Sequence, residues 1–316
     1  MGKTAFVLNV AQNMAFKEGK TVAIFSLEMS KEQLVNRLLA MESHVDSQNM
    51  RTGNLKDEDW TKLVEGADII GRSNLIIDED ARTTLAFVET FPDGDRDFSF
   101  YRNPGADMML RKEDLHEDLI RDAKIFHYGT LSMTHDGVRE ATKKAIDIAK
   151  ESGAILSFDP NLRPPLWDSM ERAREKMHYG FDQCDILKIA DNELQFATGE
   201  TDFDAGVRRL QKQYGIPLIL LTLGKDGSRA YFGDLRVDAP AFLHDKVADT
   251  TGAGDTFCAC ALHHVLEHGM DFTAESLREM LTFANAAASL ITMRKGAMCA
   301  MPAAEEVADL VRTASN

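Results

Sequence analysis

The sequence has few cysteines and no apolar run that could cross a membrane. Its four cysteines are Cys184, Cys258, Cys260 and Cys299, and none of them form a C-x-x-C pair. That pattern indicates reduced thiols in the core of a cytoplasmic protein. No apolar run approaches the roughly 18 residues of a spanning helix, and the N-terminus lacks the order of a signal peptide. We therefore expect a cytoplasmic protein with no membrane partner.

Basic residues form no run, and the 36 Lys and Arg are outnumbered by 51 Asp and Glu. The 316 residues carry a formal net charge of −15. Such a field repels the phosphate backbone of DNA or RNA, so nucleic acid is not an expected partner. With 44% hydrophobic residues, the chain is long enough for one large α/β domain with a small accessory piece.

The stretch from 249 to 257 carries the clearest chemical signal. It reads Asp-Thr-Thr-Gly-Ala-Gly-Asp-Thr-Phe, and the residues from 256 to 268 have a helical pattern. Gly252 and Gly254 allow a tight turn and leave backbone amides uncovered. A helix that starts after them would direct its unpaired N–H groups and positive dipole end at one anion site.

Asp255 lies beside this predicted anion site. A carboxylate there suits a general base that takes a proton from a hydroxyl, which then attacks a phosphate. The alternative is an Asp that caps a helix after a flexible turn.

Alternating strand and helix patterns predict a mostly parallel sheet covered on both faces. Two further strands, at 85–91 and 97–101, flank a turn at 92–95. The main expected strands are 125–128, 154–158, 185–190 and 217–222. The main expected helices are 137–152, 204–214, 256–268 and 274–293.

The central stretch and several others resemble the ribokinase-like sugar kinases of the PfkB family, most closely the bacterial fructokinases. The similar segments, in family order, are 83–87, 101–107, 158–163, 222–227 and 249–260. The resemblance implies a three-layer ribokinase-like α/β fold. It also implies transfer of the γ-phosphoryl group of ATP to a hydroxyl of fructose or a related sugar. Mg²⁺ would be bound to the ATP. We also consider a homodimer.

The resemblance assigns roles to individual residues. Asp255 would be the base, and the amides of Gly252, Ala253 and Gly254 would hold the charge that develops on the phosphoryl group. The residues expected to contact the sugar or its product phosphate are Arg102, Asn103, Asn161 and Arg163. The residues expected to bind the nucleotide are Thr222, Gly224, Gly227, Asn285 and Gly296. The residues expected to bind a monovalent cation are Asp249 and Thr251.

Local chemistry leaves alternatives open for these assignments. Asn161 and Arg163 follow an apolar strand, where open α/β sheets bind ligands, but they also fit a proline-stiffened loop. Arg102 could simply be solvated, and Asn285 could be a core-capping residue. The glycines after Thr222 allow close approach of phosphates, but they also fit a plain β-turn.

Glu193 is the candidate for a metal role. The family often has N-x-x-E at this place, linked to Mg²⁺ through water, whereas this chain has Ala190 in the amide position. A carboxylate is the stronger oxygen ligand, so the retained Glu193 keeps the more important half of the motif. The alternative is an acid in the first turn of a helix, where it favours the dipole.

Residues 1 to about 78 resemble a different family, the DnaB-type replicative helicases. Residues 2–6 match the end of the helicase phosphate loop, and residues 25–29 match the strand that ends in the catalytic glutamate. The residues that would form the cradle of the phosphate loop are missing. We therefore expect Lys3, Thr4 and Glu28 to have only a packing role. The apolar spacing at 4–16 predicts a helix there.

The two resemblances divide the chain into residues 1–80 and 81–316, with a seam at the acidic residues 78–80. The N-terminal segment could complete the kinase sheet. Sugar kinases of this family begin with a sugar-contacting Asp and a Gly-Gly motif, and residues 1–80 contain no Gly-Gly. An inactive or impaired fusion protein is therefore one alternative function. A helicase-derived module that binds nucleotide or DNA is another.

Overall fold

The computed structural model describes residues 22–24, 31–45, 49–50, 55–71, 75–77, 85–90, 96–102, 105–244, 246–296 and 300–314. The chain forms two compact units, residues 1–85 with 101–109 and residues 86–100 with 110–316. Several predicted features lie outside the described residues: the helix at 4–16, Lys3, Thr4, Glu28, the seam at 78–80, the turn at 92–95, and Asn103.

In the part of the first unit that the structure describes, a short parallel strand pair is connected through a helical segment. Strand β1 (Val22–Ile24) pairs with β2 (Leu75–Ile77), and helices α2 (Lys31–Ser43) and α4 (Asp57–Gly71) lie between them in the sequence. Parallel strands need a long crossover, which the helical segment supplies.

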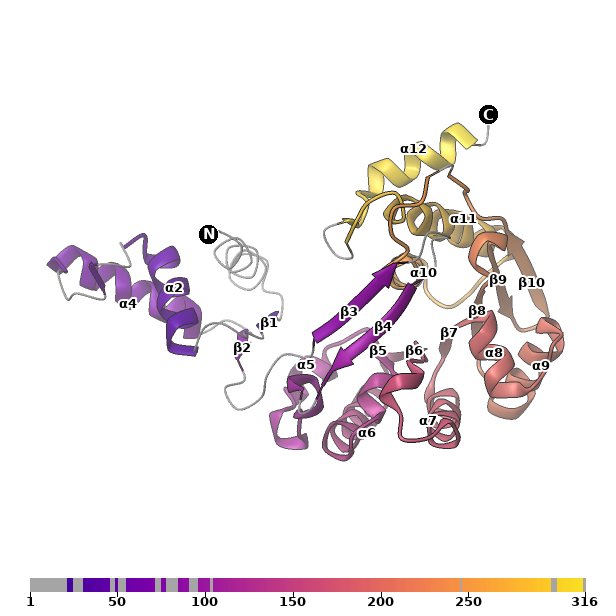
Figure 1. Ribbon diagram of the computed structural model, residues 1–316, viewed down its shortest axis with the longest axis horizontal. Helices are drawn as coiled ribbons and strands as arrows, with labels where there is room; N and C mark the ends of the chain where they lie inside the picture. The colour runs from indigo at the N-terminus through magenta and orange to yellow at the C-terminus, as the bar shows by residue number, and fades with distance from the viewer. Residues whose placement is uncertain are drawn as a thin grey trace. The chain divides into compact units, whose positions relative to one another are not determined.

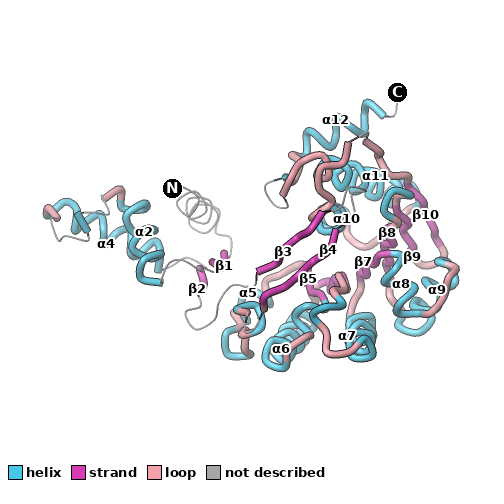
Figure 2. The backbone as a smooth tube through the Cα atoms, viewed as in Figure 1, coloured by secondary structure: helices cyan, strands magenta, loops and turns pink. Residues whose placement is uncertain are grey.

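The second unit is built on a six-stranded sheet with the order β10-β9-β8-β7-β6-β5 (Figures 1 and 2). Strands β5 to β8 are parallel, and β9 and β10 are added in antiparallel fashion. The bounds are β5 (Ile125–Gly129), β6 (Ile155–Asp159), β7 (Ile186–Ala190), β8 (Leu218–Thr222), β9 (Ser228–Phe232) and β10 (Leu235–Ala239). The four parallel strands confirm the sequence prediction. The hairpin of β9 and β10 was not predicted. The sequence analysis identified only the glycine-containing turn between β8 and β9.

Helices cover both faces of this sheet, which gives the predicted three-layer α/β fold. On one face lie α6 (Asp136–Glu151), α7 (Met170–Gln183), α8 (Asp191–Thr198) and α9 (Phe203–Tyr214). On the other lie α10 (Ala253–His268) and α11 (Ala274–Ile291), and α12 (Ala304–Ala314) packs on α11 (Figure 1). The short helix α5 (Glu117–Arg121) precedes β5, and strands β3 (Leu85–Thr90) and β4 (Arg96–Tyr101) form a separate pair.

Side chains of the buried strands alternate between the two helical layers. In β8, Leu218 and Leu220 join the core under α10 and α11, whereas Ile219 and Leu221 join the core on the opposite face. All four are completely buried. Successive residues of a strand point to opposite faces, so a one-residue shift in register would exchange these two sets and is strongly disfavoured.

Helix α10 begins earlier than the sequence predicted. We expected its start at 256, but its first residue is Ala253, with Gly252 as the N-cap at φ +82°. The left-handed conformation of Gly252 turns the chain, and the N–H of Ala253 donates to the carbonyl of Thr250. Asp255 therefore belongs to the first helical turn rather than to the loop before it.

Helix α7 packs tightly on the sheet at Gly180. A Cβ added there would lie 2.2 Å from Cζ of Phe158, which is completely buried in β6. Overpacking of a core costs about 1–3 kcal/mol, and better helix propensity offsets about 1 kcal/mol. Because the clash is severe, we expect Gly180→Ala to lower the free energy of unfolding by about 2 kcal/mol in urea denaturation.

Gly206→Ala in α9 is a matched control. Its added Cβ would lie 3.2 Å from the Leu194 side chain, which can move slightly. We expect a change below about 1 kcal/mol there. Equal stability of the two variants would contradict this account of the packing between α7 and β6.

Candidate active site

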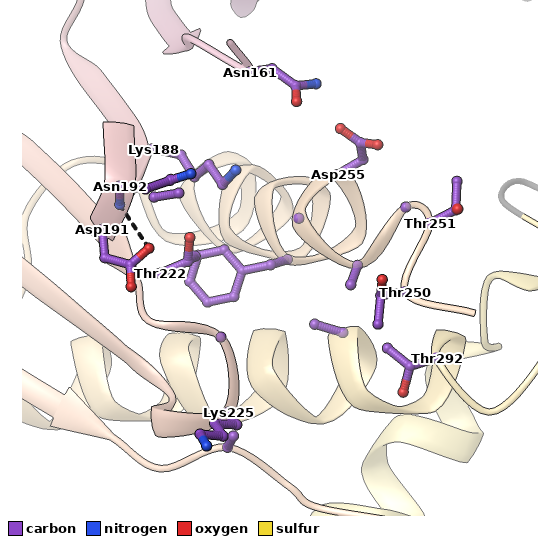
Figure 3. A pocket seen from close by; sticks show the side chains of 18 of the residues that line it. Asn161, Lys188, Asp191, Asn192, Thr222, Lys225, Thr250, Thr251, Asp255 and Thr292 are labelled. Atoms are coloured by element: carbon purple, nitrogen blue, oxygen red, sulfur yellow. Dashed lines mark hydrogen bonds between the residues drawn. The ribbon is translucent and has the colours of Figure 1, made fainter. Parts of the chain in front are cut away.

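A pocket of about 840 Å³ lies in the second unit at the carboxyl ends of its parallel strands (Figure 3). Asn161 follows β6, Ala190 ends β7 and Thr222 ends β8, and all three line the pocket. This is the position at which open α/β sheets bind ligands. The predicted site residues that line it are Asn161, Arg163, Glu193, Thr222, Gly224, Gly227, Thr251, Gly252, Ala253, Gly254, Asp255 and Asn285.

The first turn of α10 forms one wall of the pocket. Ala253 N–H donates to Thr250, and Thr256 N–H donates to the carbonyl of Gly252. Among the described residues, the amides of Gly254 and Asp255 have no acceptor. Unpaired amides at the positive end of a 16-residue helix attract an anion.

Asp255 presents its carboxylate to the same pocket. The residue is exposed to solvent, and the part of the chain that the structure describes provides it with no ion pair or side-chain hydrogen bond. Its side chain does not cap the helix, which was the alternative reading of this motif, because no capping bond is formed. The carboxylate is therefore accessible to a substrate hydroxyl.

The sequence analysis missed a buried ion pair on the pocket floor. Nζ of Lys188 in β7 lies 3.0 Å from Oδ2 of Asp159 at the end of β6, and the side chains are 7% and 5% exposed. Lys188 lines the pocket. Burial alone would lower the pKa of Lys188, but the negative charges of Asp159 and Glu193 outweigh burial and raise it. A lysine within an otherwise apolar strand is the sequence signal that could have revealed the pair.

Glu193 connects the loop after β6 to the start of α8. Its Oε1 accepts the N–H of Leu162 at 2.7 Å, and its Oε2 accepts the N–H of Ala190 at 2.9 Å. Burial and the charge of Asp159 raise the pKa of Glu193, and Lys188 acts in the opposite direction. The carboxylate holds the local backbone and also lines the pocket, so its predicted metal role stays a prediction.

The loop after β6 is held in an unusual conformation. Asn161 has φ +43°, in the left-handed region that Asn tolerates better than most residues. Its N–H donates to Oδ1 of Asp159 at 3.2 Å. Nη1 of Arg163 donates to the carbonyl of Leu162 at 3.2 Å. These contacts keep both predicted sugar-binding residues at the pocket wall.

The predicted nucleotide residues Thr222, Gly224, Gly227 and Asn285 lie together at another part of this pocket. Gly227 has φ +95°, and a Cβ there would lie 2.1 Å from the carbonyl of Ala239, so a side chain is excluded. The amide nitrogen of Asn285 donates to the carbonyls of Ala239 and Pro240, and its oxygen accepts from Ser228. Asn285 therefore holds β10 and β9 to α11, as the core-capping alternative proposed.

The predicted cation residues form a network of their own. Oδ1 of Asp249 accepts the N–H of Thr251 at 2.9 Å, and its Oδ2 accepts the N–H of Gly296 at 3.2 Å. Thr251 lines the pocket, whereas Asp249 and Gly296 are not among the pocket residues. Within the described ranges, no group of three or more His, Cys, Asp or Glu side chains could hold a metal ion alone.

Arg102 belongs to the first compact unit. Its Nε donates to Oδ2 of Asp107 at 2.7 Å, and its side chain is only 8% exposed. This ion pair argues against simple solvation of Arg102. The predicted sugar contacts of Arg102 and of Asn103, which lies outside the described residues, stay predictions.

Comparison with known proteins agrees with this geometry. Residues 67–304 match the pfkB family carbohydrate kinase model. Probable fructokinase-2 of Arabidopsis thaliana is 42% identical over 254 residues, or 79% of this chain and 77% of the relative. Fructokinase-2 of Solanum lycopersicum is 39% identical over 264 residues, or 82% of this chain and 80% of the relative.

Solved structures agree as well. A fructokinase with bound ATP from Xylella fastidiosa has a TM-score of 0.68 and 32% identity, over 77% of each chain. A fructokinase double mutant from Vibrio cholerae has a TM-score of 0.69 over 96% of this chain and 89% of that chain, and its 23% identity makes it evidence of fold alone.

The chain belongs to the PfkB family of carbohydrate kinases. It is an α/β enzyme with the ribokinase-like fold, and it functions as a sugar kinase. These findings confirm the family, the fold class and the enzyme class that the sequence predicted.

The second resemblance is confirmed too. Residues 1–90 match the model of the DnaB-like helicase C terminal domain. The two family matches overlap, because the kinase match starts at 67 and the helicase match ends at 90. The predicted seam at 78–80 falls inside this overlap. No helix among the described residues has the length and apolar character that a membrane crossing requires.

Two variants of Asn161 test the strain in the loop after β6. Both Asn161→Ala and Asn161→Gly remove the amide, but only Ala resists φ +43°. The left-handed conformation costs a residue with Cβ about 1–2 kcal/mol, and the larger entropy of unfolded Gly offsets about 0.4–1 kcal/mol. We expect Asn161→Ala to unfold with about 1 kcal/mol less free energy than Asn161→Gly in denaturant titrations. Equal or greater stability of Asn161→Ala would show that the loop relaxes.

Proposed function

We propose that this enzyme phosphorylates fructose or a related sugar with ATP, and that Asp255 is the general base. The observation that carries the proposal is the exposed carboxylate of Asp255 beside the unpaired amides of the α10 N-terminus, in one pocket. The names of the relatives support fructose as the acceptor. The solved fructokinase from Xylella fastidiosa, at 32% identity, contains bound ATP, which supports ATP as the phosphoryl donor.

The reaction follows from the positions of these groups. The carboxylate of Asp255 accepts the proton of a sugar hydroxyl, and that oxygen attacks the γ-phosphorus of ATP. The bond from phosphorus to the bridging oxygen breaks, and ADP leaves. The amides of Gly254 and Asp255, with the dipole of α10, stabilise negative charge on the phosphoryl oxygens.

The remaining pocket residues support a nucleotide at the other end. Gly224 and Gly227 leave the backbone beside Thr222 open to phosphate groups. Leu243, Val247 and Ala288 provide apolar contacts for the adenine ring. Mg²⁺ bound with ATP would neutralise phosphate charge. Glu193 fits a water-mediated contact to this ion because its carboxylate lines the pocket, and the described residues form no dedicated three-ligand site.

A monovalent cation near Asp249 and Thr251 is a further part of the proposal. The carboxylate of Asp249 already orients the backbone of Thr251 and Gly296, which would place carbonyl oxygens around a cation. We also propose the domain division at residue 80. The helicase match over 1–90 supports it, and it keeps an impaired fusion protein as the second candidate.

Asp255→Asn tests the assignment of the base. The change removes the proton acceptor and keeps the size of the side chain, so we expect kcat to fall at least about 100-fold. Coupled ADP-release assays with fructose and other hexoses measure this loss. Thermal unfolding should be unchanged, because the Asp255 side chain makes no hydrogen bond or ion pair within the described residues.

Asp191→Asn provides a matched control, since this half-buried residue lines the same pocket away from the α10 N-terminus. We expect its kcat to stay within a few fold of the wild-type value. Wild-type turnover by Asp255→Asn would refute the base assignment. Cooperative unfolding and ATP binding without any sugar phosphorylation by the wild type would instead favour the impaired fusion.

A further inference from the structure

Lys188 is a buried cation that the reaction described above does not use. It lies in the centre of β7, its side chain is 7% exposed, and it lines the active-site pocket. Burial of a charged side chain is costly unless partners compensate it. Its place beside the reacting groups therefore calls for a functional explanation in addition to a structural one.

The ammonium group of Lys188 lies against the first turn of α10. A Cβ added to Gly254 would be 3.1 Å from Nζ, so the ammonium lies close to the residue whose amide is unpaired. Figure 3 draws Lys188 and Asp255 near this same turn. An anion bound at the helix N-terminus would lie next to the ammonium as well.

The hydrogen-bonding capacity of Lys188 is only partly used. An ammonium group has three N–H donors. The described residues provide one acceptor, Oδ2 of Asp159, whose Oδ1 already accepts the N–H of Asn161. The other donors of Lys188 have no protein acceptor within the described ranges and adjoin the pocket. An ion pair with a purely structural role would leave these donors unsatisfied.

The surrounding charges keep Lys188 ionised. Burial would lower its pKa, yet the carboxylates of Asp159 and Glu193 raise the pKa above the ordinary value. Lysine binds phosphate as a compact point charge. A permanently charged lysine beside unpaired amides matches the three oxygens of a transferring phosphoryl group.

We propose that Lys188 is a further catalytic residue, which donates hydrogen bonds to the γ-phosphoryl group of ATP while Asp159 holds its ammonium in place. This rests on the proposed function. The γ-phosphorus loses its bond to the bridging oxygen of ADP and gains a bond to the sugar oxygen. The sugar proton goes to Asp255, and Lys188 keeps its three protons throughout. Lys188 stabilises charge on the phosphoryl oxygens and Asp159 is a positioning residue.

The test uses the full-length enzyme with two variants. Lys188→Met alone would leave Asp159 buried without a partner, which is strongly destabilising. The informative variant is therefore Lys188→Met with Asp159→Asn, which removes both charges and keeps similar volumes. Asp159→Asn alone is the comparison variant: it retains the ammonium, Glu193 still provides negative charge near it, and the amide oxygen can accept its hydrogen bond. Thermal unfolding establishes that both variants are folded.

The decisive readout is the affinity for a non-hydrolysable ATP analogue, AMP-PNP, compared with ADP, both with Mg²⁺. We expect the double variant to lose about 10- to 100-fold in affinity for the analogue, the size of a charge-assisted hydrogen bond, and little for ADP. Asp159→Asn keeps the ammonium but weakens its anchor, so its preference for the analogue should fall between those of the wild type and the double variant. With sugar present, kcat of the double variant should fall about 100-fold while the KM for sugar changes little.

The two proposals fail in distinguishable ways. An unchanged ratio of analogue to ADP affinity in the double variant, with wild-type kcat, would overturn the role of Lys188 and leave the sugar-kinase proposal intact. A wild-type enzyme that phosphorylates no sugar would overturn the proposed acceptor. The affinity ratio would still decide whether Lys188 contacts the γ-phosphoryl group. A wild type that binds neither nucleotide would overturn both.

Discussion

The packing of α10 on the sheet is the constraint on which the active site depends. Phe257 and Ala261 of this helix are buried against the strands, within the same core as Leu220 of β8. This burial fixes the helix axis, so its N-terminus meets the loops that follow the parallel strands. Gly252 then turns the chain, and the unpaired amides and Asp255 reach the pocket together.

Charge is balanced locally around this helix end. Asp159, Glu193 and Asp255 bring negative charge to the region of this pocket, which by itself would repel the ATP that we propose binds there. Lys188 and the α10 dipole supply opposite charge, and the Mg²⁺ that we propose accompanies ATP would add to it. Buried Asp159 and Glu193 also hold backbone N–H groups, so they serve both the architecture and the electrostatics.

The N-terminal part of the chain poses a different structural question. The kinase match begins at 67 and the helicase match ends at 90, so the pieces of two families meet within one chain. The kinase unit nevertheless keeps the six-stranded sheet, both helical layers and the pocket with its anion-binding turn. The pocket that we propose for phosphoryl transfer is therefore lined by residues that follow the predicted seam.

The sequence alone determined the family, the alternation of parallel strands and helices, and the group of residues around Asp255, because these depend on local patterns. The start of α10 at Ala253 and the β9–β10 hairpin depend on backbone conformation and pairing, which residue type only weakly specifies. Only the tertiary structure revealed the pairing of Lys188 with Asp159. These residues are 29 positions apart in sequence, and parallel β6 and β7 bring them to 3.0 Å. It also showed the hydrogen bonds of Asn285 to two chain segments, since partners distant in sequence become neighbours only when the sheet forms.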